Sequence, residues 1–265
     1  MNATEVGWID ADWPAPPGVC AVTTTRSGGE SRSSYASLNL GDGTGDAPAT
    51  VVRNRARLRL ALGLEHEPCW LEQVHGSDVV RAARYDPVPK ADASVGEPGS
   101  PPCAVLTADC LPVVLCDTSG TRVGIAHAGW RGLANGVIAR CVEFMDRPGR
   151  DLLAWLGPAI GQDSYEIGRE VRDACLAAAP GARGAFAPSP ARTDHWLADL
   201  YAIAACQLES LGVGRVHGGG FCTYRDRSRF FSHRRDGATG RFATLAWIHC
   251  PEPTKFTDSR LRTRI

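Results

Sequence analysis

The sequence has no excess of charge of either sign, since its 265 residues carry 29 Lys and Arg against 29 Asp and Glu. A protein that attracts nucleic acid or an anionic membrane through its overall field usually carries a basic excess. No apolar run approaches the roughly 20 residues that span a bilayer, and the first residues, MNATEVGWID, lack the features of a secretory signal. We therefore expect a cytoplasmic protein that binds neither nucleic acid nor a membrane.

Motifs of several enzyme classes are also missing. The chain has no Walker phosphate loop and no G-x-G-x-x-G run opening a βαβ unit, which argues against nucleoside triphosphate and dinucleotide enzymes. The run His217–Gly220 resembles an esterase oxyanion hole, but the G-x-S-x-G nucleophile elbow that must accompany it is absent. Ten cysteines are scattered without a C-x-x-C pair, which favours reduced, buried thiols over a disulfide framework.

What the chain does have is enough apolar sequence for a large core, with 43% hydrophobic residues and no composition typical of a linker. We therefore expect a single domain over residues 1–265, with the last ten or so residues, which are polar, frayed. The Gly-rich loop over 26–45 is long enough to be functional, and we expect it to be ordered and near the site. A helix is predicted over 50–62, with Thr50 or Asp46 as N-cap and Gly63 at C′.

The stretch over 104–132 carries the most promising chemistry. Its pattern predicts a strand bearing Asp109 and Cys110, a break at the next proline, and strands over 113–116 and 123–126, the last delivering His127. Another strand is predicted over 69–75 and ends at His75. Side chains at the ends of neighbouring strands can converge on one ion or reacting atom although they are far apart in sequence. A helix is expected to follow over 133–145.

His75, Cys110 and His127 together offer two imidazoles and one thiolate, a set of ligands that suits zinc or copper better than magnesium or calcium. Three protein ligands leave one coordination position open, as catalytic zinc sites do. On spacing alone the signal is weak, because ten Cys and seven His supply such a trio by chance in most chains. The alternative is a core thiol and two histidines bonded to carbonyls. The flanking Gly, Pro and Asp residues favour the functional interpretation.

A resemblance to a known family rests on motifs in order along nearly the whole chain. They are TRSGGES (25–31), SLNLG (37–41), VVRNR (51–55), WLEQVHG (70–76), TADCLPVVL (107–115), AHAGWRG (126–132), GPAIGQDSYEIG (157–168) and FFSHRRDGATGR (230–241). In these runs the chain resembles the YfiH or laccase-domain family, also called the multifunctional purine nucleoside phosphorylase family.

The resemblance implies a cytoplasmic, mixed α/β fold of the layered sandwich type, with a cleft that holds a metal on His75, Cys110 and His127. Zinc is the usual assignment, and copper is a possible one. Members are credited with phosphorolysis of adenosine, inosine and methylthioadenosine to a free base and the corresponding pentose 1-phosphate, and with adenosine deamination. The substrates would be small molecules, purine nucleosides and phosphate.

Both reactions need further groups. For deamination a proton must be shuttled, and Asp109 and Glu166 are candidates by their place in the sequence; Asp109 is equally well explained as a residue that orients the ligands. Phosphorolysis needs a cation for phosphate, and the forked guanidinium of arginine suits it. Arg55 is the first choice, followed by Arg26 and the pair Arg234–Arg235, for which surface charge is the default interpretation.

Three more residues are expected to contact substrate, namely Gln73, Trp130 and Arg131, although packing under the loop is the more frequent fate of a tryptophan such as Trp130.

Other functions use the same residues. Cys110 with His127 or His75 as base is the arrangement of a thiol hydrolase. A metal-binding protein without catalysis is a different class, and copper-dependent phenol oxidation is disfavoured because one Cys and two His do not supply several copper sites.

Overall fold

The computed structural model describes residues 5–249, and the predicted frayed C-terminus lies outside these residues. The strands are β1 (Trp8–Asp10), β2 (Val19–Thr24), β3 (Val79–Arg81), β4 (Ala93–Gly96), β5 (Cys103–Thr107), β6 (Leu111–Asp117), β7 (Val123–Ala128), β8 (Leu152–Leu156), β9 (Glu166–Gly168), β10 (Phe186–Pro188), β11 (His195–Ala198), β12 (Arg215–Gly218) and β13 (Phe242–Ile248). The α-helices are α1 (Pro48–Ala61), α2 (Trp130–Ala134), α3 (Val137–Met145), α4 (Arg169–Ala178), α5 (Leu200–Ser210) and α6 (His233–Asp236).

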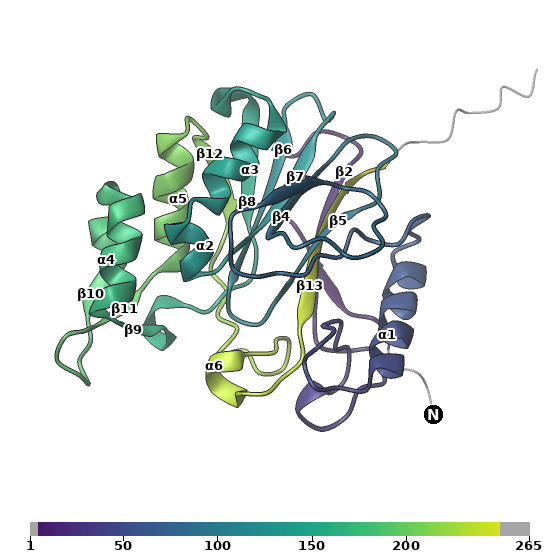
Figure 1. Cartoon of the computed structure of the whole chain (residues 1–265), viewed down its shortest axis with the longest axis horizontal. Coiled ribbons are helices and arrows are strands. Elements are labelled where there is room, and N and C mark those ends of the chain that lie inside the picture. Colours follow the sequence, from purple (N-terminus) through teal and green to yellow (C-terminus); the bar gives the residue numbers. More distant parts are fainter. Residues whose placement is uncertain (1–4, 250–265) are drawn as a thin grey trace, which may run out of the picture.

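Two large sheets face each other at the centre of the molecule. The six-stranded sheet has the order β12-β8-β6-β7-β4-β3, with antiparallel pairs at its middle and a parallel pair at each edge. The four-stranded sheet, β1-β2-β13-β5, is antiparallel throughout, and a small antiparallel sheet, β10-β11-β9, lies beside α4 (Figure 1). Strands β5 and β6 are consecutive but belong to different sheets, so the short connection between them crosses from one layer to the other.

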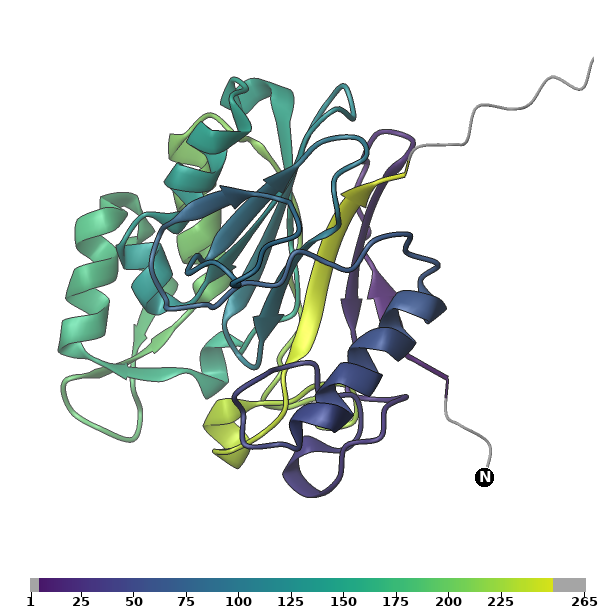
Figure 2. The same cartoon turned by 45° about the vertical axis from the view of Figure 1, so that its right-hand side comes forward.

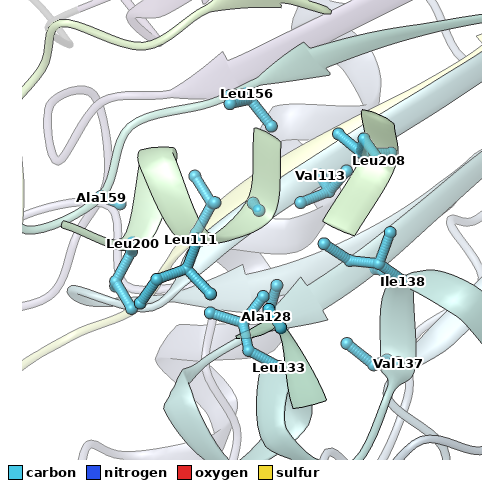
Figure 3. Packing of buried hydrophobic residues seen from close by; sticks show 14 of the residues in the cluster. Leu111, Val113, Ala128, Leu133, Val137, Ile138, Leu156, Ala159, Leu200 and Leu208 are labelled. Carbon is cyan, nitrogen blue, oxygen red and sulfur yellow. The ribbon is translucent and has the colours of Figure 1, made fainter. Parts of the chain in front are cut away.

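Strand β6 shows why the chain layers in this way. Its seven residues are all buried, and successive side chains point to opposite faces. Val113 and Leu115 face α3 and α5 in one core, whereas Val114 and Cys116 join a second core between the two sheets. Figure 3 shows the first of these cores, where Val113 lies near Leu208 of α5 and Ile138 of α3. A strand that is apolar on both faces can only be stable in the middle of a sandwich.

A third core covers the outer face of the four-stranded sheet. There Leu58 of α1 packs with Leu245 of β13 and with Leu38 and Leu40 of the loop over 26–45. The layers are therefore helices, sheet, sheet and helix, with α1 on the outside (Figure 2). The predicted mixed α/β sandwich is confirmed. That the chain forms a single domain stays a prediction. Within residues 5–249, the two faces of the six-stranded sheet contribute to two neighbouring cores.

Several predicted elements are confirmed and others are wrong in detail. Helix α1 spans the predicted segment and ends before Gly63, whose φ of +61° fits the C′ position. Its N-cap is Ala47, so neither Thr50 nor Asp46 caps it; Pro48, with its fixed φ, takes the first helical position instead. The helix predicted over 133–145 is broken into α2 and α3 at Gly136, which has a φ of +78°.

Two predicted strand boundaries are also wrong. The segment 69–75 forms only isolated bridges, because side chains of other segments bind several of its backbone groups. The proline at 112 does not break the chain but is the second residue of β6, paired with His127 of β7. None of the helices within residues 5–249 has both the length and the apolar character that crossing a membrane requires.

Candidate metal centre

His127 is fixed by the sheet on which it lies. It occupies the penultimate position of β7 and is almost fully buried. Its Nδ1 lies 2.8 Å from Oδ1 of Asp92, a residue that is fully buried just before β4. A carboxylate on one ring nitrogen holds the imidazole in a single orientation and leaves Nε2 available as a ligand.

Asp92 also shapes the loop that carries His75. Its two carboxylate oxygens accept hydrogen bonds from the backbone N–H groups of Val74, His75 and Gly76, at 3.1, 3.0 and 2.6 Å. His75 has a φ of +59°, a left-handed conformation that is uncommon for a side chain of this size. Three donors converging on one buried carboxylate supply the constraint that keeps this conformation populated.

Cys110 follows a second residue of unusual conformation. Asp109 has a φ of +104° in the connection that crosses from β5 to β6. Its carboxylate accepts hydrogen bonds from the Thr223 hydroxyl at 2.6 Å and from the Arg234 backbone N–H at 2.7 Å. These bonds to the C-terminal part of the chain hold the turn, and thereby the Cys110 thiol, in place.

The three side chains meet at one point. The ligand atoms of His75, Cys110 and His127 all lie within 4.8 Å of one another, and the two imidazole rings are edge to face. Gly129, which follows β7, leaves room for this approach, since a Cβ atom there would lie 2.7 Å from Sγ of Cys110. The fold therefore brings the three residues together, as the sequence predicted.

Charge in this cluster is shared between sulfur and imidazole. Burial by itself raises the pKa of the Cys110 thiol, but the neighbouring His127 and His75 outweigh it and lower that pKa. Burial by itself lowers the pKa of His127, but the Cys110 thiolate and the Asp92 carboxylate outweigh it and raise that pKa. The protein thus favours the thiolate, which is the form that binds metals.

This donor set fits a metal ion. Sulfur and imidazole nitrogen are the ligands that zinc and copper prefer, and Asp92 supplies the outer carboxylate that metal-bound histidines commonly have. Among the residues that the structure describes, His75, Cys110 and His127 are the one cluster of His, Cys, Asp and Glu with this potential. Three ligands rather than four leave a position for a substrate or water.

The cluster lies in the wall of a pocket of about 770 Å³, which is large enough for a nucleoside. Beside the three ligands, the pocket is lined by Gly41, Asp42, Gly43, Thr44, Arg55, Trp70, Leu71, Glu72, Gln73, Val88, Leu106, Thr107, Ala108, Arg131, His233 and Arg241. The residues from Gly41 to Thr44 belong to the long loop over 26–45, which is thus ordered and close to the cluster, as expected.

Three of the residues predicted to contact substrate line this pocket. Arg55 donates from Nε to the Leu40 carbonyl at 2.9 Å and stacks over the Trp70 ring. Arg131 stacks over Trp130, its centre 4.4 Å from the ring. Gln73 is bonded through both its amide oxygen and its amide nitrogen to the backbone of Leu106, so it also fastens its segment to β5.

Other predicted residues are not among those that line the pocket. The Asp109 carboxylate is taken up by Thr223 and Arg234, which supports its role in orienting the cluster rather than in proton transfer. Trp130, the first residue of α2, is partly buried and packs against the core that contains Val113 and Leu115. Arg26 donates to the carbonyl groups of residues 36 and 227.

The remaining candidates have structural partners as well. Arg234 donates to the Glu166 carbonyl, and Arg235 donates to the carbonyls of residues 223, 224 and 230 and pairs with Asp236. The Glu166 carboxylate is bound by Ser189 and Arg192. None of these three is among the residues that line the pocket.

Four residues at or near the site were not singled out from the sequence. They are Asp92, Gly129, His233 and Arg241. Gly129, His233 and Arg241 fall within motifs that carried the family resemblance, which was the available signal for them. Asp92 lies in none of those motifs, and only the need of a metal-binding histidine for a carboxylate partner pointed to such a residue.

Comparisons with known proteins identify the family of this chain. A family model described as "Multi-copper polyphenol oxidoreductase laccase" matches residues 20–249. A purine nucleoside phosphorylase of Pseudomonas aeruginosa is 52% identical over 250 residues, covering 94% of this chain and 99% of that protein. Purine nucleoside phosphorylase YfiH of Escherichia coli is 48% identical over 242 residues, covering 91% and 98%.

Solved structures show the same architecture. A crystal structure of a Neisseria meningitidis protein matches with a TM-score of 0.87 and 48% identity, covering 92% of this chain and all of that one. YlmD from Geobacillus stearothermophilus matches with a TM-score of 0.83 and 30% identity, covering 92% and 97%. The chain belongs to the YfiH family of laccase-like domains.

Proposed function

We propose that this chain is a metal-dependent purine nucleoside phosphorylase that acts on adenosine, inosine and methylthioadenosine. The observation that carries the proposal is the cluster of His75, Cys110 and His127 in the wall of a pocket of nucleoside size. The proposed reaction is the one for which the relatives are named, purine nucleoside phosphorolysis. The arginines that line the pocket carry the positive charge that phosphate binding needs. We take zinc as the resident ion, with copper as the alternative.

Phosphorolysis forms a bond between a phosphate oxygen and C1′ of the sugar while the bond from C1′ to the purine nitrogen breaks. The apolar side chains of Trp70, Leu71 and Leu106 offer the base and sugar a surface away from water. The leaving purine needs a proton, and His233, which lines the pocket, would supply it from Nε2 as an imidazolium. Its Nδ1 lies 2.8 Å from the Gly237 carbonyl, so Nδ1–H donates there and Nε2 remains for the substrate.

The same site supports a second reaction, adenosine deamination. His75, Cys110 and His127 would hold a zinc ion with one open position, and such an ion would supply the Lewis-acid chemistry that replacement of the purine amine by water needs. Glu72, whose carboxylate also pairs with Lys90, and His233 are the pocket residues proposed to move the proton. They replace Asp109 and Glu166, which are not among the residues that line the pocket.

The test is to incubate metal-analysed protein with adenosine, with and without phosphate, and to separate the products by chromatography. Phosphate-dependent adenine and ribose 1-phosphate support phosphorolysis, and phosphate-independent inosine supports deamination. Absence of both, with inosine and methylthioadenosine also unchanged, would show that the assigned function is wrong.

A thiol hydrolase is the second candidate, because Cys110, His127 and Asp92 are linked as nucleophile, base and orienting carboxylate. The discriminating experiment is complete metal removal followed by an assay for ester hydrolysis. Activity that survives metal removal and is lost on treatment with iodoacetamide would favour the thiol. Phosphorolysis of adenosine, assayed on the same samples, that disappears with the metal and returns on its addition favours the phosphorylase.

A further inference from the structure

Three arginines line the pocket, and none of them forms an ion pair with any carboxylate of residues 5–249. They are Arg55, Arg131 and Arg241. Arg55 belongs to α1, and its neighbours on that helix behave differently, since Arg53 and Arg57 both form ion pairs with Glu30. The pocket wall therefore carries positive charge that the surrounding protein does not neutralise by direct contact.

Arg55 and Arg241 are held together through one residue. Arg55 donates from Nε to the carbonyl of Leu40 at 2.9 Å, and the N–H of Leu40 donates to the carbonyl of Arg241 at 3.0 Å. Leu40 itself is fully buried beneath the four-stranded sheet. Two arginines that are far apart in sequence thus share a rigid support, one arriving from α1 and the other from the segment before β13.

Each guanidinium keeps donors to spare. Arg241 donates from Nη1 to the carbonyls of Thr239 and Gly240, at 2.8 and 3.1 Å, while its Nε and Nη2 have no partner within residues 5–249. Both Nη atoms of Arg55 are likewise without one there. The Arg241 stem packs closely against Gly41, so closely that a Cβ atom at that glycine would lie 2.7 Å from Cγ of Arg241. Fixed stems with unused N–H groups are what binding of an oxyanion requires.

Burial lowers the pKa of both guanidiniums, which expresses the cost of keeping a cation away from water. Neighbouring acidic groups offset this in part: Asp42 and Glu67 near Arg55, and Cys110, Asp109 and Tyr35 near Arg241. An anion bound between the two side chains would offset the rest. Arg55 and Arg241 line the same pocket as Cys110, which places that anion beside the candidate metal centre.

We propose that Arg55 and Arg241 form an oxyanion subsite that binds inorganic phosphate next to the metal centre. The identity of the anion rests on the phosphorylase function proposed above. The subsite itself rests on the two partner-free guanidiniums in one pocket. Arg241 then fixes the position of phosphate relative to the sugar, a role that was not expected from the sequence.

The test compares Arg241→Gln, Arg241→Lys and the control Arg59→Gln, which removes the same charge from α1 one turn beyond Arg55 and outside the pocket. The KM for phosphate is measured at saturating inosine, and the KM for inosine at saturating phosphate. Loss of hydrogen bonds from a charged group to phosphate corresponds to about a tenfold to hundredfold rise in the KM for phosphate. We expect this for Arg241→Gln, a smaller rise for Arg241→Lys, and none for Arg59→Gln.

Metal content and phosphate binding without nucleoside complete the test. We expect Arg241→Gln to keep the metal content of the unchanged protein while losing inorganic phosphate binding in calorimetry. A loss of metal instead would assign Arg241 to support of Cys110 and overturn the subsite, as would an unchanged KM for phosphate. If the unchanged protein binds phosphate through Arg241 but cleaves no nucleoside, the subsite stands and the proposed function fails.

Discussion

The two ends of the β6–β7 hairpin are built by the same means and serve different purposes. At the turn end, the buried Asp117 accepts hydrogen bonds from the backbone N–H groups of Thr121 and Arg122 and from the hydroxyls of Ser119 and Thr121. At the other end, the buried Asp92 accepts three backbone N–H groups around His75. Each carboxylate folds a loop around itself and satisfies the loop's donors.

The difference lies in one further partner. Asp117 also forms an ion pair with Arg147, which is half-exposed at the surface. Asp92 instead bonds to His127, whose ring also interacts with Cys110 beside the pocket. A buried carboxylate with all its bonds made is therefore not by itself a sign of function. What marks the functional end is a chain of contacts that leads from the carboxylate to a group able to bind a metal. The predictions below separate the two ends by experiment.

The largest effect is expected when the functional end loses a ligand. Cys110→Ala and His127→Ala should each reduce nucleoside turnover to the background of a metal-free control, because two remaining ligands do not hold a catalytic ion. Circular dichroism should show an unchanged fold, since neither side chain belongs to the hydrophobic cores. Full activity in either variant would contradict the assigned site.

A smaller effect on metal is expected from Asp92→Asn. An amide in place of the carboxylate presents N–H groups to backbone donors and weakens the orientation of His127. Loss of such an outer partner typically costs about tenfold to a hundredfold in metal affinity. Competition with a chelator measures this. Asp117→Asn is the matched control, and an equal loss of metal affinity in both variants would erase the distinction between the two ends.

The space at Gly129 allows a sharper test of the functional end. A Cβ atom there would lie 2.7 Å from the Cys110 sulfur, while Gly129 has a φ of −67° that alanine adopts freely. Gly129→Ala should therefore displace the thiol without backbone strain and lower metal affinity by about tenfold.

Gly184→Ala is the control for that substitution, because nothing lies within 4 Å of the Cβ atom it would add. We expect it to bind metal as the unchanged protein does. Metal affinity that is the same in both alanine variants would show that the thiol does not need its present position.

The turn end should respond in stability alone. Burial by itself raises the pKa of Asp117, but hydrogen bonds from Thr121 and Ser119 outweigh it and lower the pKa to about 2, from an ordinary 3.8. A depressed carboxylate pKa stabilises the fold above the unfolded value and loses that contribution as the pH falls through 3.8 toward 2. Asp117→Asn should cost about 2 kcal/mol at pH 7, with metal content and turnover unchanged.

Urea unfolding at pH 7 and at lower pH values checks this prediction. The difference in unfolding free energy between Asp117→Asn and the unchanged protein should shrink as the pH falls below 4, on the reasoning given for Asp117. A difference that stays constant over this range would assign the cost to packing instead of ionisation.

Much of the fold could be predicted from the sequence where a pattern is local. The strand β7 and the helix α1 were recognisable because β-branched residues and a terminal glycine act within a few positions. The segment over 69–75 was mistaken for a strand because its hydrogen bonds run through side chains, which local apolar alternation does not encode. Its Gln73 side chain accepts from the Leu106 backbone N–H, and its Val74 backbone N–H donates to the Asp92 carboxylate.

The site divides in the same way. His75, Cys110 and His127 could be found by residue type, motif and strand end, since the chemistry of a ligand is a property of the residue. Arg241 and Asp92 could not, because their roles depend on which distant segments the sheets bring together. Asp109 and Arg26 show the converse, since residues of the right type found partners elsewhere in the fold.

The most direct test of the central claim is the number of metal ions per chain, measured by elemental analysis together with nucleoside turnover on the same samples. The account predicts one ion per chain in the unchanged protein, and parallel loss of ion and turnover in His75→Ala, Cys110→Ala and His127→Ala. Turnover that persists in metal-free protein, or a full ion count in all three variants, would contradict it.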